Sequence, residues 1–481
     1  MNRPTRRNFL KHAAATGIVA STTISGTKSS GQVIGANDRV RVAIAGINGR
    51  GKIHMGDLGG IKNVEITHLV DPDSRLFASR SATVERYSGK KPKCVQDIRE
   101  VLEDPTVDAV TIATPNHWHA LMTIWACQAG KDVYVEKPCS HNIVEGRRMV
   151  EAAQKYGRIV QHGTQWRSDP KWQAYTTDIR DGKYGKLETA SIQIFRPRKS
   201  IGIKNPIQPP RELDYDLWTG PAPLNPYRTN LVHYRWHWMW DYGNGEIGNL
   251  GSHEIEMVRW AMPASASPKS VVSLGGRYGY EDQADTPNTQ LTLYDFGDAK
   301  VVCQQRGLHF DKPLKMSIDF HTDEGVIKEG KFYLHGKETG EVIEGAPVSG
   351  LPENSARAHL QNFIDCVRSR KSEDLASDVL DGHRTAVMAH LGNISYRLGK
   401  EASFRNEPHP LSENQFASDS FEGMKRHLVD TASLNLSNAS YRLGPTLPFD
   451  ATTETFLDNS KANQLLSGTY RSGFELPSFT S

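Results

Sequence analysis

The sequence has few cysteines for its length, no long apolar run and no excess of charge of one sign. Five cysteines are scattered over 481 residues without a CxxC pair or a Cys/His ligand spacing, so neither a disulfide framework nor a metal site is expected. No stretch approaches the roughly 18–20 consecutive apolar residues of a membrane span. The 58 basic and 55 acidic residues nearly balance, which gives no electrostatic reason to expect nucleic-acid binding.

The remaining composition is that of a globular protein. Apolar residues make up 37% of the chain and charged residues 23%. A chain of 481 residues exceeds one ordinary hydrophobic core, so we expect two domains with additional segments.

The N-terminus carries a basic motif. The string TRRNFLK (residues 5–11) precedes a weakly apolar segment of small residues and resembles a twin-arginine export signal. Paired arginines alone would also fit a basic, unstructured N-terminus, but the full string favours periplasmic localisation through the twin-arginine export machinery. We therefore assign residues 1–36 to a signal and linker, with cleavage between Ser21 and Ala36. No cysteine near its end offers a lipid anchor.

From Arg39 onward, short β-branched runs alternate with helical stretches, which predicts a parallel sheet covered by helices on both faces. The expected strands are 40–46, 64–70, 108–114, 131–136 and 159–163. The expected helices are 74–87, 97–103, 117–129 and 141–156. We predict a Rossmann dinucleotide-binding domain over residues 38–162.

The pattern beyond Thr164 changes to alternating segments typical of antiparallel strands. The expected strands are 188–195, 270–280, 289–296, 300–305 and 314–322, and the expected helices are 252–262, 357–370 and 381–398. This pattern predicts an α+β domain with an open antiparallel sheet over residues 164–400. A broad open sheet can pair with a second subunit, which leaves a homo-oligomer open.

The last part of the chain, residues 401–481, is assigned to an insertion and a C-terminal tail. The Ser/Asn-rich stretch 401–437 is expected to be an insertion or surface excursion, and the closing segment is expected to pack back on the body.

A glycine-rich turn follows the first expected strand. Gly46 and Gly51 occupy the outer positions of a G-x-G-x-x-G dinucleotide motif, and Asn48 replaces the middle glycine. Asn tolerates positive φ better than other non-glycine residues, and the neighbouring Gly49 adds freedom. We expect this turn, including Arg50, to bind the cofactor.

Asp71 ends the second expected strand, 20 residues after Gly51. A carboxylate there accepts ribose hydroxyls and repels a 2′-phosphate, which favours NAD over NADP. The alternative is an ordinary Asp that caps the following helix.

The string TIATPNHWHA (residues 111–120) ends another strand. Ligands of open α/β sheets bind at the carboxyl ends of the strands, so Thr114, Pro115, Asn116 and His119 are predicted to face the cofactor. His117 is expected only to begin a helix.

These motifs, together with EKP (residues 136–138) and GNGEIGNLGSHEIEMVRW (residues 243–260), resemble the glucose–fructose oxidoreductase/inositol dehydrogenase (Gfo/Idh/MocA) family. The segments 359–371 and 383–399 resemble the final helices of that family, so the resemblance covers residues 39–399. It implies a Rossmann domain, an antiparallel α/β domain, and hydride transfer between a nicotinamide and a sugar or polyol carbon.

The resemblance makes Lys137 the active-site lysine and His253 the catalytic histidine. An ammonium at Lys137 would stabilise the alkoxide that forms as hydride leaves, and it would lower the pKa of a nearby imidazole. His253 would exchange a proton with the substrate hydroxyl. Pro138 would set the turn, and Glu136 would accept hydrogen bonds from the cofactor or the lysine.

One catalytic position departs from the family, which commonly has Asp where this chain has Asn249. Residues four apart share a helix face, so Asn249 can still contact the substrate or His253. It lacks the charge that stabilises an imidazolium, and we therefore expect a lower pKa for His253 than in Asp-bearing relatives.

Two aromatic segments, GTQWRSDP (residues 163–170) and HYRWHWMWDY (residues 233–242), are predicted to bind the nicotinamide and the substrate. Flat apolar side chains suit the C–H faces of sugars, and the charged residues suit their hydroxyls. The predicted residues are Gln165 for the cofactor, and Trp166, Arg167, Arg235, Trp236, His237 and Asp241 for the carbohydrate. For Trp238 and Trp240, a buried core or an oligomer contact is an equal alternative.

An exported dehydrogenase has no obvious pool of free NAD, so we expect the nucleotide to be tightly bound. Two alternatives are an NAD-dependent glycoside hydrolase that acts by transient oxidation and elimination, and a non-catalytic sugar-binding protein that keeps the fold.

Overall fold

The computed structural model describes residues 39–309, 315–347, 355–405 and 411–479. The predicted export signal, residues 1–36, lies outside these ranges. Within them, no helix combines the length and the apolar character needed to cross a bilayer.

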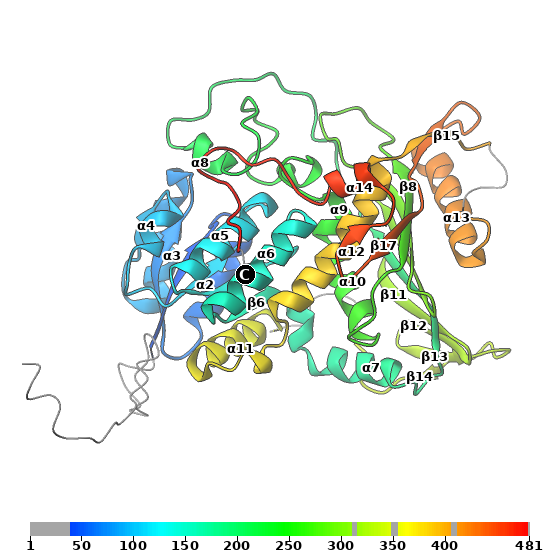
Figure 1. Cartoon of the computed structure of the whole chain (residues 1–481), viewed down its shortest axis with the longest axis horizontal. Coiled ribbons are helices and arrows are strands. Elements are labelled where there is room, and N and C mark those ends of the chain that lie inside the picture. Colours follow the sequence, from blue (N-terminus) through cyan, green and yellow to red (C-terminus); the bar gives the residue numbers. More distant parts are fainter. Residues whose placement is uncertain (1–38, 310–314, 348–354, 406–410, 480–481) are drawn as a thin grey trace, which may run out of the picture. The chain divides into compact units, whose positions relative to one another are not determined.

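The N-terminal sheet contains six parallel strands in the order β3-β2-β1-β4-β5-β6, which confirms the predicted Rossmann fold. It belongs to the part of the chain coloured blue to cyan in Figure 1. Its strands are β1 (Val40–Ala45), β2 (Val64–Val70), β3 (Lys93–Val95), β4 (Ala109–Ile112), β5 (Asp132–Glu136) and β6 (Val160–Gly163). Its helices are α2 (Arg50–Gly59), α3 (Phe77–Ser88), α4 (Ile98–Leu102), α5 (Asn116–Gln128) and α6 (Ile143–Tyr156).

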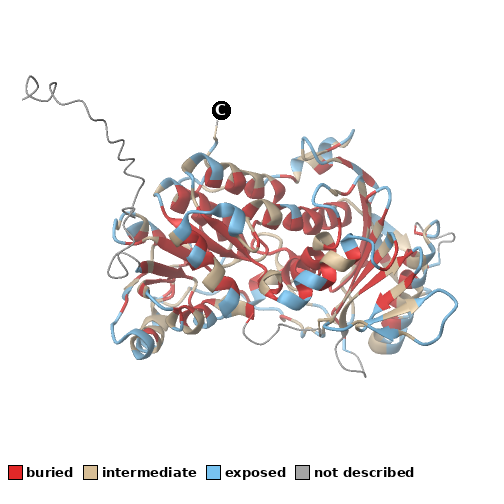
Figure 2. Ribbon diagram, turned by 90° about the horizontal axis from the view of Figure 1, so that it is seen from below, coloured by how far each residue is buried: buried red, intermediate tan, exposed pale blue. Residues whose placement is uncertain are grey.

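Strands β4 and β5 are buried at every residue, as expected for a parallel sheet covered on both faces (Figure 2). Sequence analysis missed β3, because three residues with the sequence KCV at a sheet edge carry no periodic signal.

Helix α11 (Ser355–Ser369) covers one face of the Rossmann sheet, although its sequence position suggested the second domain. Its apolar residues Leu360, Phe363 and Ile364 form one buried cluster with Val42 and Ile44 of β1. The apolar face of α11 is buried against the first sheet, so the chain packs on the Rossmann domain again after the second domain has begun. The order of the elements along the sequence did not predict this.

The second sheet follows the order β14-β13-β12-β11-β7-β10-β9-β8-β16-β15, and β17 pairs with β8 and with β18. Its strands are β7 (Leu187–Phe195), β8 (Ser270–Gly276), β9 (Thr289–Asp295), β10 (Lys300–Arg306), β11 (Lys315–Thr322), β12 (Gly325–Lys328), β13 (Lys331–Leu334), β14 (Glu341–Val342), β15 (Lys400–Ser403), β16 (Ser440–Leu443), β17 (Leu447–Asp450) and β18 (Thr455–Phe456).

The fold class, a Rossmann domain followed by an α+β domain, is confirmed, with one difference in strand direction. Strands β7 and β10 are parallel neighbours, so the second sheet is mixed. A parallel pair needs a long crossover, and residues 196–299 provide one.

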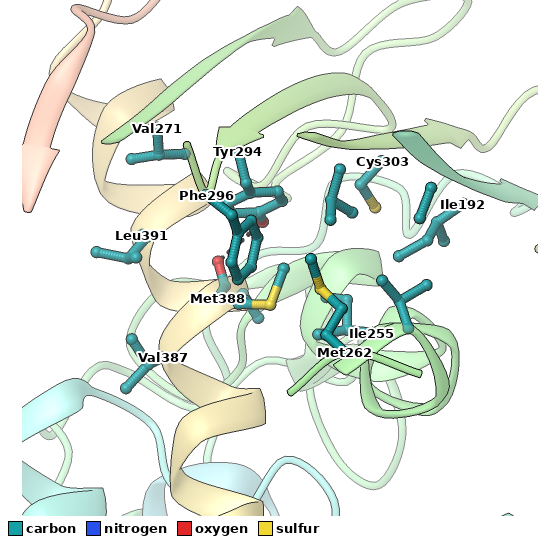
Figure 3. Packing of buried hydrophobic residues seen from close by; sticks show 14 of the residues in the cluster. Ile192, Ile255, Met262, Val271, Tyr294, Phe296, Cys303, Val387, Met388 and Leu391 are labelled. Atoms are coloured by element: carbon teal, nitrogen blue, oxygen red, sulfur yellow. Dashed lines mark hydrogen bonds between the residues drawn. The ribbon is translucent and has the colours of Figure 1, made fainter. Parts of the chain in front are cut away.

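Helices α10 (Gly251–Trp260) and α12 (Val379–Arg397) pack on this sheet (Figure 3). Ile255 of α10 and Met388 of α12 lie in one cluster with Tyr294 of β9, whose hydroxyl donates to the Met388 carbonyl at 2.8 Å. This core fixes α10, the helix that carries His253.

Residues 401–437, expected as a surface excursion, contain most of β15 and the whole of helix α13 (Gln415–Ala432). Phe421, Met424 and Leu428 of α13 are buried in one cluster with Leu291 and Val302 of the sheet. The helix therefore covers part of the sheet, and its apolar spacing was overlooked among polar residues.

The C-terminal tail includes α14 (Ser460–Gln464) and packs on the body of the protein. Phe474 lies against Trp118 of α5, with ring centroids 5.6 Å apart. The Tyr470 hydroxyl donates to Glu145 of α6 at 3.2 Å.

Candidate active site

A cavity of about 360 Å³ opens at the carboxyl ends of the Rossmann strands and is closed by residues of 217–237 and by helices α9 (Gly245–Asn249) and α10. It brings together most of the predicted site residues. The predicted residues that line it are Gly46, Asn48, Gly49, Arg50, Asp71, Thr114, Pro115, Asn116, His119, Glu136, Lys137, Gln165, Trp236, His237, Asn249 and His253.

The glycine turn places backbone very close to its neighbours. At Gly46, where φ is +79°, an added Cβ would lie 2.6 Å from the Ala113 carbonyl carbon. At Gly51 an added Cβ would lie 2.0 Å from the Gly46 carbonyl oxygen, so Gly51 supports the helix without lining the cavity. The left-handed residue is Gly46, and Asn48 does not adopt the positive φ considered for it.

Asp71 shapes the turn through both carboxylate oxygens. They accept hydrogen bonds from the backbone N–H groups of Ile47 and Asp73, each at 3.0 Å. Burial raises the pKa of Asp71 to about 6 despite these bonds. Asp71 therefore lines the cavity and also fixes the loop. Neither role is the helix cap that was considered as the alternative for this residue.

The segment after β4 is held by hydrogen bonds on both sides. The ring nitrogens of His119 lie 2.7 Å from the Pro138 carbonyl oxygen and 2.9 Å from that of Thr114. His119 thus ties two strand ends together as well as lining the cavity. The Thr114 hydroxyl is buried without a hydrogen-bond partner.

Lys137 follows β5, and its ammonium donates to two oxygens of Asn249, the backbone carbonyl at 2.7 Å and the side-chain carbonyl at 3.0 Å. Burial lowers the pKa of Lys137, and the negative charges of Glu136 and Glu246 oppose that effect. A partly desolvated ammonium held at a strand end is suited to stabilising negative charge on a substrate oxygen.

His253 of α10 lines the same cavity as Lys137. Its ring stacks on Trp166, with centroids 5.4 Å apart, and its Nδ1 is buried without a hydrogen-bond partner. Burial, followed by the positive charge of Lys137, lowers the pKa of His253 to about 3. The imidazole is therefore neutral near pH 7 and available to accept a proton.

Glu136 is the centre of a buried cluster rather than a partner of the lysine. One of its oxygens, Oε1, accepts from Arg50 at 2.7 Å and Gln165 at 3.0 Å and lies 3.0 Å from Nε2 of His54. Burial alone would raise its pKa, but the Arg50 charge and the His54 contact hold the pKa of Glu136 well below its usual range. Arg50 keeps one buried nitrogen, Nη2, without a partner.

Sequence reasoning missed Glu246, one helical turn before Asn249. Glu246 forms a bidentate ion pair with Arg198 at 2.6 and 2.7 Å and accepts a long hydrogen bond from the Asn249 amide at 3.4 Å. Its position in the GNGEIGN string, three residues before Asn249, was the available signal. This carboxylate supplies negative charge where Asn249 does not.

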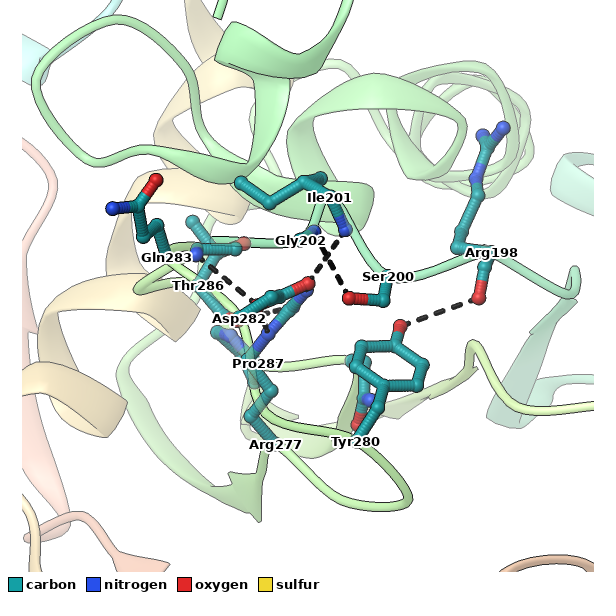
Figure 4. Close-up of polar contacts among 12 residues, drawn as sticks. Arg198, Ser200, Ile201, Gly202, Arg277, Tyr280, Asp282, Gln283, Thr286 and Pro287 are labelled. Carbon is teal, nitrogen blue, oxygen red and sulfur yellow. Dashed lines mark hydrogen bonds and ion pairs between the residues drawn. The ribbon is translucent and has the colours of Figure 1, made fainter. Parts of the chain in front are cut away.

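The loop that contains Arg198 is attached to the β8–β9 connection (Figure 4). The Ile201 N–H donates to the Asp282 carboxylate at 2.7 Å, and the Arg277 guanidinium donates two hydrogen bonds to the same carboxylate at 2.7 and 2.8 Å. The Tyr280 hydroxyl donates to the Arg198 carbonyl at 3.2 Å. These bonds fix the loop beside the cavity.

Four residues predicted to bind substrate do not line this cavity. Trp166 is buried between Trp172 and His253, and Arg167 pairs with Glu256 and Asp381. Their position after β6 suggested the cavity, but their side chains pack into the second domain.

The other two are Arg235, which donates to the Ile201 carbonyl at 3.1 Å, and Asp241, which accepts from Asn225 at 2.7 Å. Residues that sequence reasoning did not name, His233, Tyr234 and Trp218, line the cavity instead. Nothing in the aromatic-rich loop indicated which rings face inward.

The cavity fits a dinucleotide. The Gly46–Gly51 turn leaves no room for side chains at its two outer glycines, and nothing lies within 4 Å of a Cβ added at Gly49. The unpartnered Arg50 nitrogen and Thr114 hydroxyl belong to residues that line the cavity. These groups suit pyrophosphate at the N-terminus of α2, and Asp71 suits a ribose.

Two family models match the chain. The oxidoreductase family model with an NAD-binding Rossmann fold matches residues 40–164, and the C-terminal alpha/beta domain model of the same family matches residues 201–430. Together they cover most of the chain, which belongs to the Gfo/Idh/MocA oxidoreductase family.

The curated relatives match only part of this chain and only part of their own length. Similar proteins are scyllo-inositol 2-dehydrogenase (NAD(+)) of Bacillus subtilis, 34% identical over 31% of this chain and 42% of the relative, and a glycosyl hydrolase family 109 protein of Shewanella, 32% identical over 31% and 37%. The rhizopine catabolism protein MocA of Rhizobium meliloti is 25% identical over 46% and 57%. The matches thus span less than two thirds of these relatives.

Solved structures share the fold. The WlbA dehydrogenase of Bordetella pertussis, in complex with NADH and UDP-GlcNAcA, has a TM-score of 0.56 at 19% identity over 75% of this chain and 97% of its own. Levoglucosan dehydrogenase in complex with NADH and levoglucosan has a TM-score of 0.54 at 16% identity over 73% and 96%.

Proposed function

We propose that this protein is an NAD-dependent oxidoreductase that transfers hydride between a tightly bound nicotinamide and a hydroxyl-bearing carbon of a sugar, polyol or glycoside. The observation that carries the proposal is the meeting of Lys137 and His253 in one cavity with the glycine turn and Asp71. NAD, when bound, supplies the hydride acceptor and donor.

The residues of the chain have separate roles in this proposal. The Lys137 ammonium, held by Asn249, donates to the substrate oxygen and stabilises its developing negative charge. The neutral His253 imidazole accepts the hydroxyl proton. Because its pKa is low, His253 is a weak base, so the acidifying effect of Lys137 on the substrate hydroxyl is essential.

The carbohydrate class is supported by the residues that close the cavity. Trp236 and His237 are stacked, with ring centroids 3.6 Å apart, and both line the cavity. Flat rings beside hydrogen-bonding groups suit a sugar or polyol.

The test uses the purified full chain after extensive dialysis. We expect native mass spectrometry to detect one nicotinamide nucleotide per chain, as NAD or NADH. A panel of sugars and polyols should then change the nicotinamide absorbance. Protein without nucleotide, which also fails to bind added NAD, would overturn the proposal.

A glycoside hydrolase is the second candidate, because a family 109 glycosyl hydrolase is among the similar proteins. In such an enzyme, transient oxidation acidifies a neighbouring C–H and permits elimination of the glycoside. Release of aglycone from aryl glycosides without net NADH would favour the hydrolase, and stoichiometric NADH formation would favour the dehydrogenase.

Export through the twin-arginine pathway to the periplasm is proposed from the sequence string at residues 5–11. That pathway carries folded proteins, which is compatible with a cofactor loaded before export. Replacement of Arg6 and Arg7 by Lys in the full chain should leave the protein in the cytoplasmic fraction. Unchanged periplasmic recovery of this variant would contradict the proposal.

A further inference from the structure

A second cavity of about 310 Å³ lies among helices α6 and α12, the segment 221–244 and the C-terminal tail, and it shares no lining residue with the first cavity. Its volume falls within the range of small-molecule sites. Asp241, predicted from the sequence to bind carbohydrate, lines this cavity instead of the first.

A pair of asparagines separates the two cavities. Asn116 lines the first cavity, and its amide donates to the side-chain carbonyl of Asn244, which lines the second, at 3.0 Å. The Asn244 amide in turn donates to the His141 carbonyl at 3.0 Å. The proposed reaction uses neither Asn244 nor the other residues of the second cavity.

The interior of the second cavity is polar, and its two histidines are neutral. Burial lowers the pKa of His141 to about 4 and that of His390 to about 3, so both imidazoles are neutral. Burial also raises the pKa of Glu145 to about 7, so this carboxyl is only partly ionised near pH 7. Asn393 is only 4% exposed, and its side-chain oxygen is a buried acceptor without a hydrogen-bond partner.

The charged groups of the cavity are few and of opposite sign. Arg397 is exposed and lies 5.3 Å from the centroid of the Trp240 ring. The Asp241 carboxylate accepts from Asn225. Within the residues that the structure describes, no cluster of three or more His, Cys, Asp or Glu residues could hold a metal ion.

Neutral donors and acceptors beside a tryptophan ring, with Arg397 and Asp241 of opposite charge and a partly ionised Glu145, match a neutral polyhydroxylated molecule better than an ion. We infer that the second cavity, lined by His141, Asn244, Asn393, Trp240 and Arg397, binds a sugar or polyol at a site distinct from the proposed catalytic cavity. This site does not depend on the proposed oxidoreductase activity.

A cavity-filling variant tests the inference. A Cβ added at Gly468 would lie 3.4 Å from Nδ2 of Asn142, with both residues lining the cavity, so Gly468→Leu places a side chain there without a backbone clash. Ser472→Leu is the matched control, since Ser472 is exposed in the same tail and lines neither cavity.

Calorimetric titration of the nucleotide-loaded full chain with glucose and myo-inositol counts the sites. We expect at least one of these ligands to saturate at two per chain in the wild type and in Ser472→Leu, and at one in Gly468→Leu. If the first cavity binds no sugar and the proposed function fails, the expected stoichiometry is one per chain in the wild type and in Ser472→Leu, and zero in Gly468→Leu. Trp240→Ala, which adds no volume, should weaken the second site at least fivefold even if Gly468→Leu fails to fold.

Charged analogues test the ligand class. Glucuronate and glucosamine should bind the second site at least fivefold more weakly than glucose. Equal stoichiometry in the wild type and a folded Gly468→Leu variant, no sugar binding by the wild type, unchanged affinity in Trp240→Ala, or tighter binding of either charged analogue would overturn the inference.

Discussion

The ammonium of Lys137 donates to both the backbone and the side-chain carbonyl oxygen of Asn249, at 2.7 and 3.0 Å. Two neutral acceptors orient this buried cation without neutralising it. The Asn249 amide donates to the Glu246 carboxylate at 3.4 Å. Asn249 thus links Lys137 to this carboxylate through hydrogen bonds. Lys137 therefore retains positive charge for a substrate oxygen.

Lys137→Met should lower the rate of hydride transfer by about 10²–10³-fold, because it removes a fixed donor to the developing alkoxide. Bound nicotinamide should be retained, since the glycine turn and Asp71 are untouched. Sugar-dependent change of nicotinamide absorbance and nucleotide content measure the two effects. Lys171→Met, at an exposed position, is the control. Unchanged activity of Lys137→Met would show that Lys137 does not stabilise the alkoxide, whereas sugar binding without turnover by the wild type would favour the non-catalytic alternative.

Asn249→Asp should move the acidic limb of the pH–rate profile to higher pH by about one unit. The new carboxylate lies at the end of α9 and lines the same cavity as His253 of α10, so it favours the protonated form of His253 and raises the pKa of the imidazole. The profile of initial rate between about pH 2 and 7, on nucleotide-loaded protein, measures the shift, since the pKa of His253 is about 3 in the wild type. An acidic limb that stays in place would show that His253 does not control it.

The parts of the site that sequence could predict are those fixed by local backbone. Gly46, Asp71, Thr114 and Lys137 each follow a strand of the Rossmann sheet, and the carboxyl ends of parallel strands meet at one edge. The spacing within GNGEIGNLGSHEIEMVRW predicted Asn249 and His253 on one helix face, which is wrong in detail: Asn249 ends α9 and His253 lies in the first turn of α10, although both line the cavity.

The parts that sequence could not predict depend on long-range packing. Arg167 lies two residues from Gln165, yet its guanidinium pairs with Glu256 and Asp381 on two other helices. Trp236 lines the first cavity and Trp240 the second, although both lie in one aromatic string. Such a string specifies burial but not which cavity a ring faces.

Gly51→Ala should destabilise the protein by about 1–3 kcal/mol or more and abolish nucleotide retention. Its Cβ would lie 2.0 Å from the Gly46 carbonyl oxygen, so the turn must move. Gly49→Ala is the matched control for folding, because nothing lies within 4 Å of its added Cβ. Denaturant unfolding and nucleotide content measure the difference. Equal stability of the two variants would contradict the close approach of α2 to the turn.

Glu254→Gln should change how stability depends on pH. Glu254 is 1% exposed, neither carboxylate oxygen has a hydrogen-bond partner, and burial raises its pKa from 4.5 to about 8. The unfolded chain releases this proton near pH 4.5 and the folded chain only near pH 8, so the contribution of Glu254 is complete below pH 4.5 and is lost as pH rises through about 8.

Glutamine cannot titrate, so the free energy of unfolding of Glu254→Gln relative to wild type should increase between pH 5 and 8, by at most about 1.4 kcal/mol per pH unit. Urea unfolding at three pH values measures this difference, and taking the difference removes the titration of the other buried carboxyls. Glu281→Gln, at an exposed position, should show a much smaller change. A constant difference between Glu254→Gln and wild type would mean that Glu254 ionises at the same pH in the folded and unfolded chains, and its low exposure would then have to be offset by a charge partner.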